Sequence, residues 1–114
     1  MSNLILGFLL FFIGQGIVWF QINGQFLWPF FKNNPLLIAF TLGSVASFVF
    51  IKATYYTVVY FDGLLWPGRF ITFASGILIF AALTYYLMGE GINIKTGISL
   101  LLSVLLITIQ IFLK

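Results

Sequence analysis

Two side-chain types are missing from this chain and a third is scarce. The sequence has no cysteine, no histidine and only two acidic residues in 114 positions, Asp62 and Glu90. The missing thiols and imidazoles exclude disulfides, thiolate nucleophiles, histidine general bases and the usual zinc and haem ligands. The two acids occupy different breaks between apolar runs, so they are expected on opposite sides of a membrane and not as a catalytic pair. We therefore expect no enzymatic activity, no metal and no cofactor.

Charged residues are scarce overall, and apolar residues take their place. Only 6% of the residues are charged, whereas ordinary soluble domains have about 25%. Hydrophobic residues make up 62% of the chain and aromatic residues 20%. This composition predicts one integral membrane domain over residues 1–114, with the lipid bilayer as its main partner. The net charge of +3 comes from scattered residues, so nucleic acid binding is not expected.

Breaks rich in proline, glycine and asparagine divide the chain into apolar runs. A membrane span needs about 20 mainly apolar residues. The runs that fit are residues 3–22, 35–58, 67–88 and 96–113. Because the connections are short, the prediction is an all-α membrane protein with four transmembrane helices in an up-down antiparallel bundle and both termini on the same side.

Aromatic residues predict the same path through the membrane. One interfacial belt is expected to contain Trp19, Trp28, Tyr85 and Tyr86, and the other Tyr55, Tyr56, Tyr60 and Trp66. Basic residues give little orientation bias, because Lys32 and Lys95 oppose Arg69 and Lys114 across the membrane. We favour termini in the cytoplasm, with the inner or plasma membrane as the location. The alternative is insertion in both orientations with assembly into an antiparallel dimer.

Small residues at helical spacing mark candidate helix-packing faces. Helices associate in lipid through close backbone contact, which small side chains allow. The candidates are Gly43 and Ser47 in the second span, Gly68, Thr72 and Gly76 in the third, and Ser99 and Ser103 in the fourth. These faces either pack within one bundle or form the seam of a homodimer or higher homo-oligomer.

Polar residues inside the spans are the candidates for a buried function, since each is costly in lipid unless paired or hydrated. Gln15 lies near the middle of the first span, between two glycines, and either bonds across helices or meets a ligand. Lys52 lies about two thirds along the second span and either extends to the interface or faces a cavity and binds an anion.

Asp62 and Arg69 flank the expected turn between the second and third spans. Asp62 and Gly63 should close one helix, and Pro67 should open the next with Arg69 in its first turn. An interfacial salt bridge, or Arg69 on a lipid phosphate, fits that geometry, so both residues are secondary candidates for ligand binding.

The chain resembles the small multidrug resistance branch of the drug/metabolite transporter superfamily. The resemblance rests on the four-span layout, the polar residue halfway down the first helix, the LWP that follows it, and above all the stretch LMGEG at 87–91 before an apolar last helix. It implies a homodimer that carries substrate between first-helix faces, where a glutamate exchanges protons for cationic substrate. Gln15 stands at the position matching that glutamate, so proton-coupled export of cationic drugs is not expected here.

Two main functional hypotheses follow from these observations. The first is a transporter-like protein that binds or moves a small hydrophobic or anionic solute or a lipid. The second is a non-transporting structural or accessory subunit of a homo-oligomer or of a complex with another membrane protein. A pore-forming oligomer is less favoured, because no span carries a polar stripe long enough to line an aqueous pore.

Overall fold

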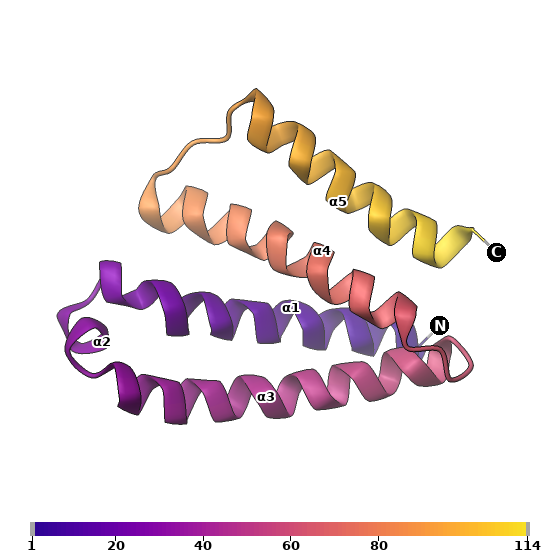
Figure 1. The fold of residues 1–114 in the computed structure, drawn as a ribbon, viewed down its shortest axis with the longest axis horizontal. Coiled ribbons are helices and arrows are strands. Elements are labelled where there is room, and N and C mark those ends of the chain that lie inside the picture. The colour runs from indigo at the N-terminus through magenta and orange to yellow at the C-terminus, as the bar shows by residue number, and fades with distance from the viewer. Residues whose placement is uncertain (1, 114) are drawn as a thin grey trace.

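The protein consists of helices joined by short connections (Figure 1). The structure, a computed structural model, describes residues 2–113. The elements in chain order are α1 (Ser2–Asn23), η1 (Gly24–Phe26), α2 (Pro29–Asn33), α3 (Pro35–Tyr60), α4 (Trp66–Leu83), η2 (Thr84–Met88) and α5 (Ile94–Phe112). The four long helical segments, Ser2–Phe26, Pro35–Tyr60, Trp66–Met88 and Ile94–Phe112, are long and apolar enough to cross a membrane. The predicted all-α, four-helix membrane fold is confirmed, and the chain is an integral membrane protein.

Local sequence signals explain where the helices begin and end. Proline occupies the first turn of α3 and of α4, where its missing N–H costs no hydrogen bond. Asn93 caps α5, with its Oδ1 accepting a hydrogen bond of 2.8 Å from the Thr96 N–H. At the end of α3, Asp62 and Gly63 adopt left-handed backbone angles, φ 57° and 91°, and the Gly63 N–H donates to Val58 O at 2.8 Å.

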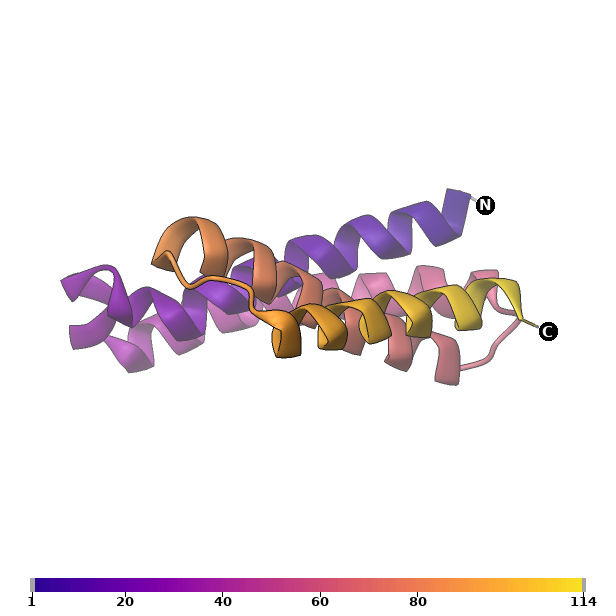
Figure 2. The same ribbon diagram turned by 90° about the horizontal axis from the view of Figure 1, so that it is seen from above.

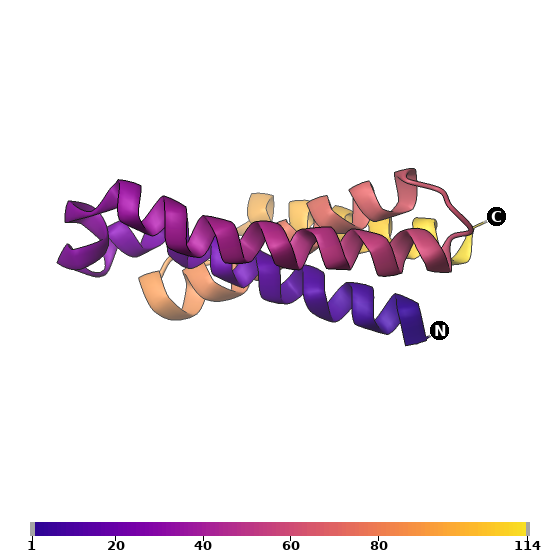
Figure 3. The same cartoon turned by 90° about the horizontal axis from the view of Figure 1, so that it is seen from below.

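The long helices lie side by side in a row whose order differs from the chain order. α1 packs against both α3 and α4, while α5 packs on the far side of α4 (Figure 1). The molecule measures 47 × 35 × 18 Å, and the edge-on views show this thin, elongated form (Figures 2 and 3). α1 and α4 run in the same direction, and the beginning of α1 lies at the same end of the molecule as the end of α5 (Figure 1).

The core lies where α1 meets α3 and α4. Phe11, Ala53 and Ile71, one from each of these helices, are almost fully buried against one another. Small or polar residues complete the contact, with Thr57 and Ser75 also fully buried. Their hydroxyls donate to carbonyl oxygens of their own helices, so neither buried hydroxyl is left unpaired.

α5 is the least covered of the long helices. Ser103 is its one buried residue in the described chain, whereas Leu101, Leu102 and Ile98 are more than half exposed. Exposed apolar side chains are stable in contact with lipid tails, so the exposed face of α5 needs no protein partner in a bilayer.

One predicted belt residue has a different role. Trp19 is 3% exposed, and its Nε1–H donates a hydrogen bond of 3.1 Å to Thr84 Oγ1. Trp19 therefore does not expose its indole as a belt residue does, because the indole is buried and bonded to Thr84 of η2. Tyr85 and Tyr86 are exposed at the same end of the bundle, as a belt requires.

Candidate functional site

A cavity of about 560 Å³ lies between α1, α3 and the beginning of α4. We call it the Gln15–Arg69 groove. α1 contributes Phe11, Gln15 and Val18, and α3 contributes Phe50 and Thr54. The remaining wall comprises Leu65 and three residues of α4, Gly68, Arg69 and Thr72. Thr54 and Arg69 are exposed, so the groove opens to the outside of the bundle.

Gln15 is fixed in the groove by a hydrogen bond to a neighbouring helix. Its Nε2 donates to Thr72 O at 3.0 Å, which links α1 to α4. Gly76 permits this approach, because a methyl group in place of its hydrogen would lie 3.0 Å from Gln15 Oε1. Within residues 2–113, Gln15 Oε1 accepts no hydrogen bond, and it is not sealed from solvent or ligand. The amide therefore keeps an acceptor for a bound molecule.

Arg69 gives the groove a positive charge that no groove residue neutralises. It is the one charged residue in the lining, since neither acid of the chain is part of the wall. In the part of the chain that the structure describes, the Arg69 guanidinium forms no salt bridge. A planar guanidinium with free N–H groups binds carboxylate or phosphate in two-point fashion.

Two smaller hollows extend the groove along the seam between α1 and α4. One, of about 300 Å³, shares Gln15, Arg69 and Thr72 with the groove and continues to Phe80. The other, of about 160 Å³, shares Gln15 and reaches Asn23 at the end of α1. Because Arg69 lies in the first turn of α4 and Asn23 ends α1, this series spans most of the membrane-crossing length.

Lys52 does not join the groove. Its side chain is exposed on α3, and it lines none of the cavities described above. It lies eight residues before Tyr60, the end of α3. That is roughly 12 Å along the axis at about 1.5 Å per residue, a distance that a lysine side chain can largely cover by extending to the interface.

Asp62 belongs to the turn between α3 and α4. Its side chain is exposed, and its positive φ places it among the residues that close α3. Asp62 and Arg69 form no ion pair within residues 2–113. The salt bridge offered by the sequence as one alternative is therefore not formed.

Some of the predicted packing residues lie between helices of this chain. Gly68 contacts Thr57 of α3, Gly76 contacts Gln15, and Gly43 lies beside Gln21 of α1. Thr72 supplies the carbonyl that Gln15 bonds, and Ser103 is buried. Ser47 and Ser99, by contrast, are exposed.

Several residues of the site were not identified from the sequence. Gly7 and Gly14 bring α1 against α3, where methyl groups in their place would lie 2.6 Å from Thr57 Oγ1 and 2.8 Å from Phe50. Their seven-residue spacing with Phe11 between them is a signal that could have indicated this face. No comparable sequence pattern indicates Thr54 or the Trp19–Thr84 bond, since each depends on residues that are far away in the chain.

Comparison of the chain with known protein families, with curated proteins and with solved structures gives no match. Among residues 2–113, no three His, Cys, Asp or Glu side chains come together as metal ligands would. The functional conclusion therefore depends on the chain's own residues.

Proposed function

We propose that this protein binds a small amphipathic anion in the Gln15–Arg69 groove and moves it along the α1–α4 seam, as a transporter-like membrane protein. The observation that carries the proposal is the row of cavities that share Gln15 and extend from Arg69 toward Asn23. A groove of about 560 Å³ falls within the roughly 300–1,000 Å³ of small-molecule sites.

The lining favours an anion with an apolar body. Phe11, Val18, Phe50 and Leu65 supply apolar surface, while Arg69 supplies the charge. The exposed Arg69 guanidinium can pair with a carboxylate, sulfonate or phosphate through two charge-assisted hydrogen bonds. Gln15 Oε1 can accept a hydrogen bond from a hydroxyl or amide of the ligand.

The resemblance to small multidrug resistance proteins supports a transport role but not their chemistry. Gln15 replaces the proton-exchanging glutamate, and the amide cannot ionise. A cation would also meet the unneutralised Arg69 charge. The proposed substrate is therefore of the opposite charge to the drugs that those proteins export.

Binding of a dansyl-labelled fatty acid to the purified protein tests this proposal. Arg69→Gln should weaken binding by about tenfold, because it removes a charge-assisted contact. Gln15→Leu should also weaken binding of the fatty acid, because it removes the polar contact from Gln15. Lys52→Gln is the matched control, since it removes a basic residue outside the groove. Unchanged affinity in Arg69→Gln, or equal affinity for a dansyl-labelled alkylamine, would refute the anion site.

A second candidate function is that of a non-transporting subunit of a homo-oligomer or larger membrane complex. The exposed face of α5 is the observation that favours it, because this helix contacts little but α4. Purification of a tagged copy from its host membrane distinguishes the two functions. A stoichiometric partner protein with no anion binding would favour the subunit role.

We further propose that the protein lies in the inner or plasma membrane with both termini in the cytoplasm. Lys32 and Lys95 lie toward one end of the bundle and Lys52 and Arg69 toward the other (Figure 1), so the charge preference is small. Reporter fusions at Lys114 provide the measurement. Signal from the cytoplasmic side alone is expected, and signal from both sides would instead support dual insertion.

A further inference from the structure

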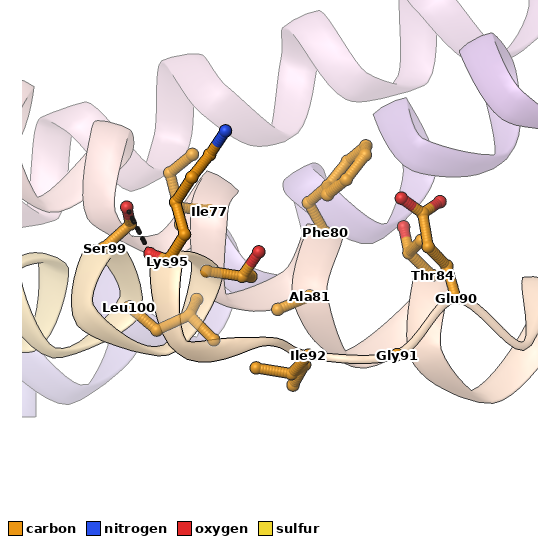
Figure 4. A pocket seen from close by; sticks show the side chains of 11 residues that line it. Ile77, Phe80, Ala81, Thr84, Glu90, Gly91, Ile92, Lys95, Ser99 and Leu100 are labelled. Atoms are coloured by element: carbon orange, nitrogen blue, oxygen red, sulfur yellow. Dashed lines mark hydrogen bonds between the residues drawn. The ribbon is translucent and has the colours of Figure 1, made fainter.

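A second, separate pocket lies between the end of α4, the connection 89–93 and the beginning of α5. Its volume is about 250 Å³, and its walls carry a carboxylate, Glu90, and an ammonium, Lys95. Ile77, Phe80 and Leu100 form the apolar part of the lining. Figure 4 shows Glu90 and Lys95 on opposite flanks of the pocket, with Phe80 between them. We call it the Glu90–Lys95 pocket.

The two charges are available to a ligand. Both side chains are exposed, and within residues 2–113 neither forms a salt bridge. They are only five residues apart in the chain, yet they do not pair with each other within residues 2–113. Lys95 also lies in the first turn of α5, where the positive end of the helix dipole favours an anion.

The charged part of the Glu90–Lys95 pocket lies toward one end of the bundle, where lipid headgroups are expected. Glu90 belongs to the connection that joins η2 to α5, and Figure 1 shows this connection at one end of the bundle. Tyr85 and Tyr86 are exposed at this end, as is typical of the membrane–water interface. Ile92, which lines the pocket, and Ile98, one turn into α5, are about half exposed, so apolar surface is available to the bilayer near the pocket.

We propose that the Glu90–Lys95 pocket binds the headgroup of a zwitterionic phospholipid that has a primary ammonium, of the phosphatidylethanolamine type. Lys95 pairs with the phosphate and Glu90 with the ammonium, so both charges are neutralised by one ligand. The pocket is smaller than the roughly 300–1,000 Å³ of most ligand sites, which suits a headgroup better than a whole lipid. The acyl chains then lie on the exposed apolar surface of α4 and α5.

Native mass spectrometry of the purified full chain, titrated with palmitoyl-oleoyl lipids, tests the proposal. Phosphatidylethanolamine should bind about tenfold more tightly than phosphatidylglycerol, which lacks the ammonium. Phosphatidylcholine should also bind less tightly, because its quaternary ammonium donates no hydrogen bond. Glu90→Gln should abolish the preference for phosphatidylethanolamine over phosphatidylglycerol, and Lys95→Gln should weaken binding of all three lipids.

Lys32→Gln is the matched control, because Lys32 is an exposed lysine of α2 at the same end of the bundle and outside the pocket. It should leave the lipid preference unchanged. Equal binding of the three lipids, or an undiminished preference in Glu90→Gln, would overturn the proposal. Displacement of bound lipid by free phosphoethanolamine at the same concentration would also overturn it, since the ligand would then be a soluble zwitterion.

Discussion

The polar side chains within the spans differ in what each one contacts. Gln15 bonds a backbone carbonyl and keeps an accessible oxygen, whereas the Trp19 Nε1–H is paired with Thr84 Oγ1 within the bundle. Lys52 has neither role, because it faces outward from α3. A polar residue in a span is therefore a ligand candidate where it keeps an unpaired polar atom beside a cavity. This condition separates Gln15 from Trp19, whose N–H is already bonded, and from Lys52, which lines none of the groove's cavities.

The Trp19–Thr84 bond should contribute measurably to stability. Thr84→Val keeps the side-chain shape but leaves the buried Trp19 N–H without an acceptor, so we expect a loss of about 1 kcal/mol in the free energy of unfolding. Unfolding in mixed micelles with increasing SDS provides the measurement. Thr41→Val is the matched control, because Thr41 is exposed and bonds only its own helix. Equal stability of the two variants would contradict a structural role for the bond.

Among the elements, α1 has the central position, because it contacts both α3 and α4 and supplies one wall of the groove. Its close approach to α3 depends on Gly7 and Gly14, whose missing side chains make room for Thr57 and Phe50. In lipid this close fit replaces the hydrophobic driving force that packs helices in water. The α1–α3 contact therefore fixes the width of the groove.

Gly7→Ala should disturb this contact. The added methyl would lie 2.6 Å from Thr57 Oγ1, too close for a normal contact. We expect a loss of about 1–3 kcal/mol in the free energy of unfolding, measured in mixed micelles. Adding Thr57→Ala should restore part of that loss by removing the clashing atom. Gly16→Ala serves as the control, since no atom lies within 4 Å of the added methyl, and a comparable loss there would argue against the close-contact explanation.

For the whole molecule, the distribution of charge limits what the proposed transport could be coupled to. Asp62 lies in the α3–α4 turn and Glu90 beside the second pocket, so neither carboxylate lines the groove. The groove thus has no acid that could exchange protons with a substrate.

Anion uptake into proteoliposomes should consequently be insensitive to an imposed pH gradient. Gln15→Glu introduces the missing acid at the position matching the family's glutamate, so it should make uptake depend on pH and weaken anion binding by like-charge repulsion. Uptake of a dansyl-labelled alkanesulfonate, whose own charge is constant, provides the measurement. Coupling to the pH gradient in the unmodified protein would contradict this view of the groove.

The sequence by itself determined that the protein lies in a lipid bilayer, how many helices cross the membrane, and where these helices begin and end. These features depend on local properties: apolar runs of sufficient length, prolines in first turns and the Asp62–Gly63 turn. The predicted spans agree closely with the helices, and the second span ends only two residues later than predicted, at Tyr60.

Only the tertiary structure decided which helix lies beside which, and hence what the polar residues do. Gln15 and Arg69 are far apart in the chain but share a groove because α4 packs on α1, while Lys52 is left outside it. Likewise, Trp19 is a buried residue because it packs against and bonds Thr84 of η2, which is far away in the chain. In a chain this uniformly apolar, all helix faces have similar affinity for lipid, so the pattern of hydrophobicity does not determine the neighbours, and close contacts between small residues do.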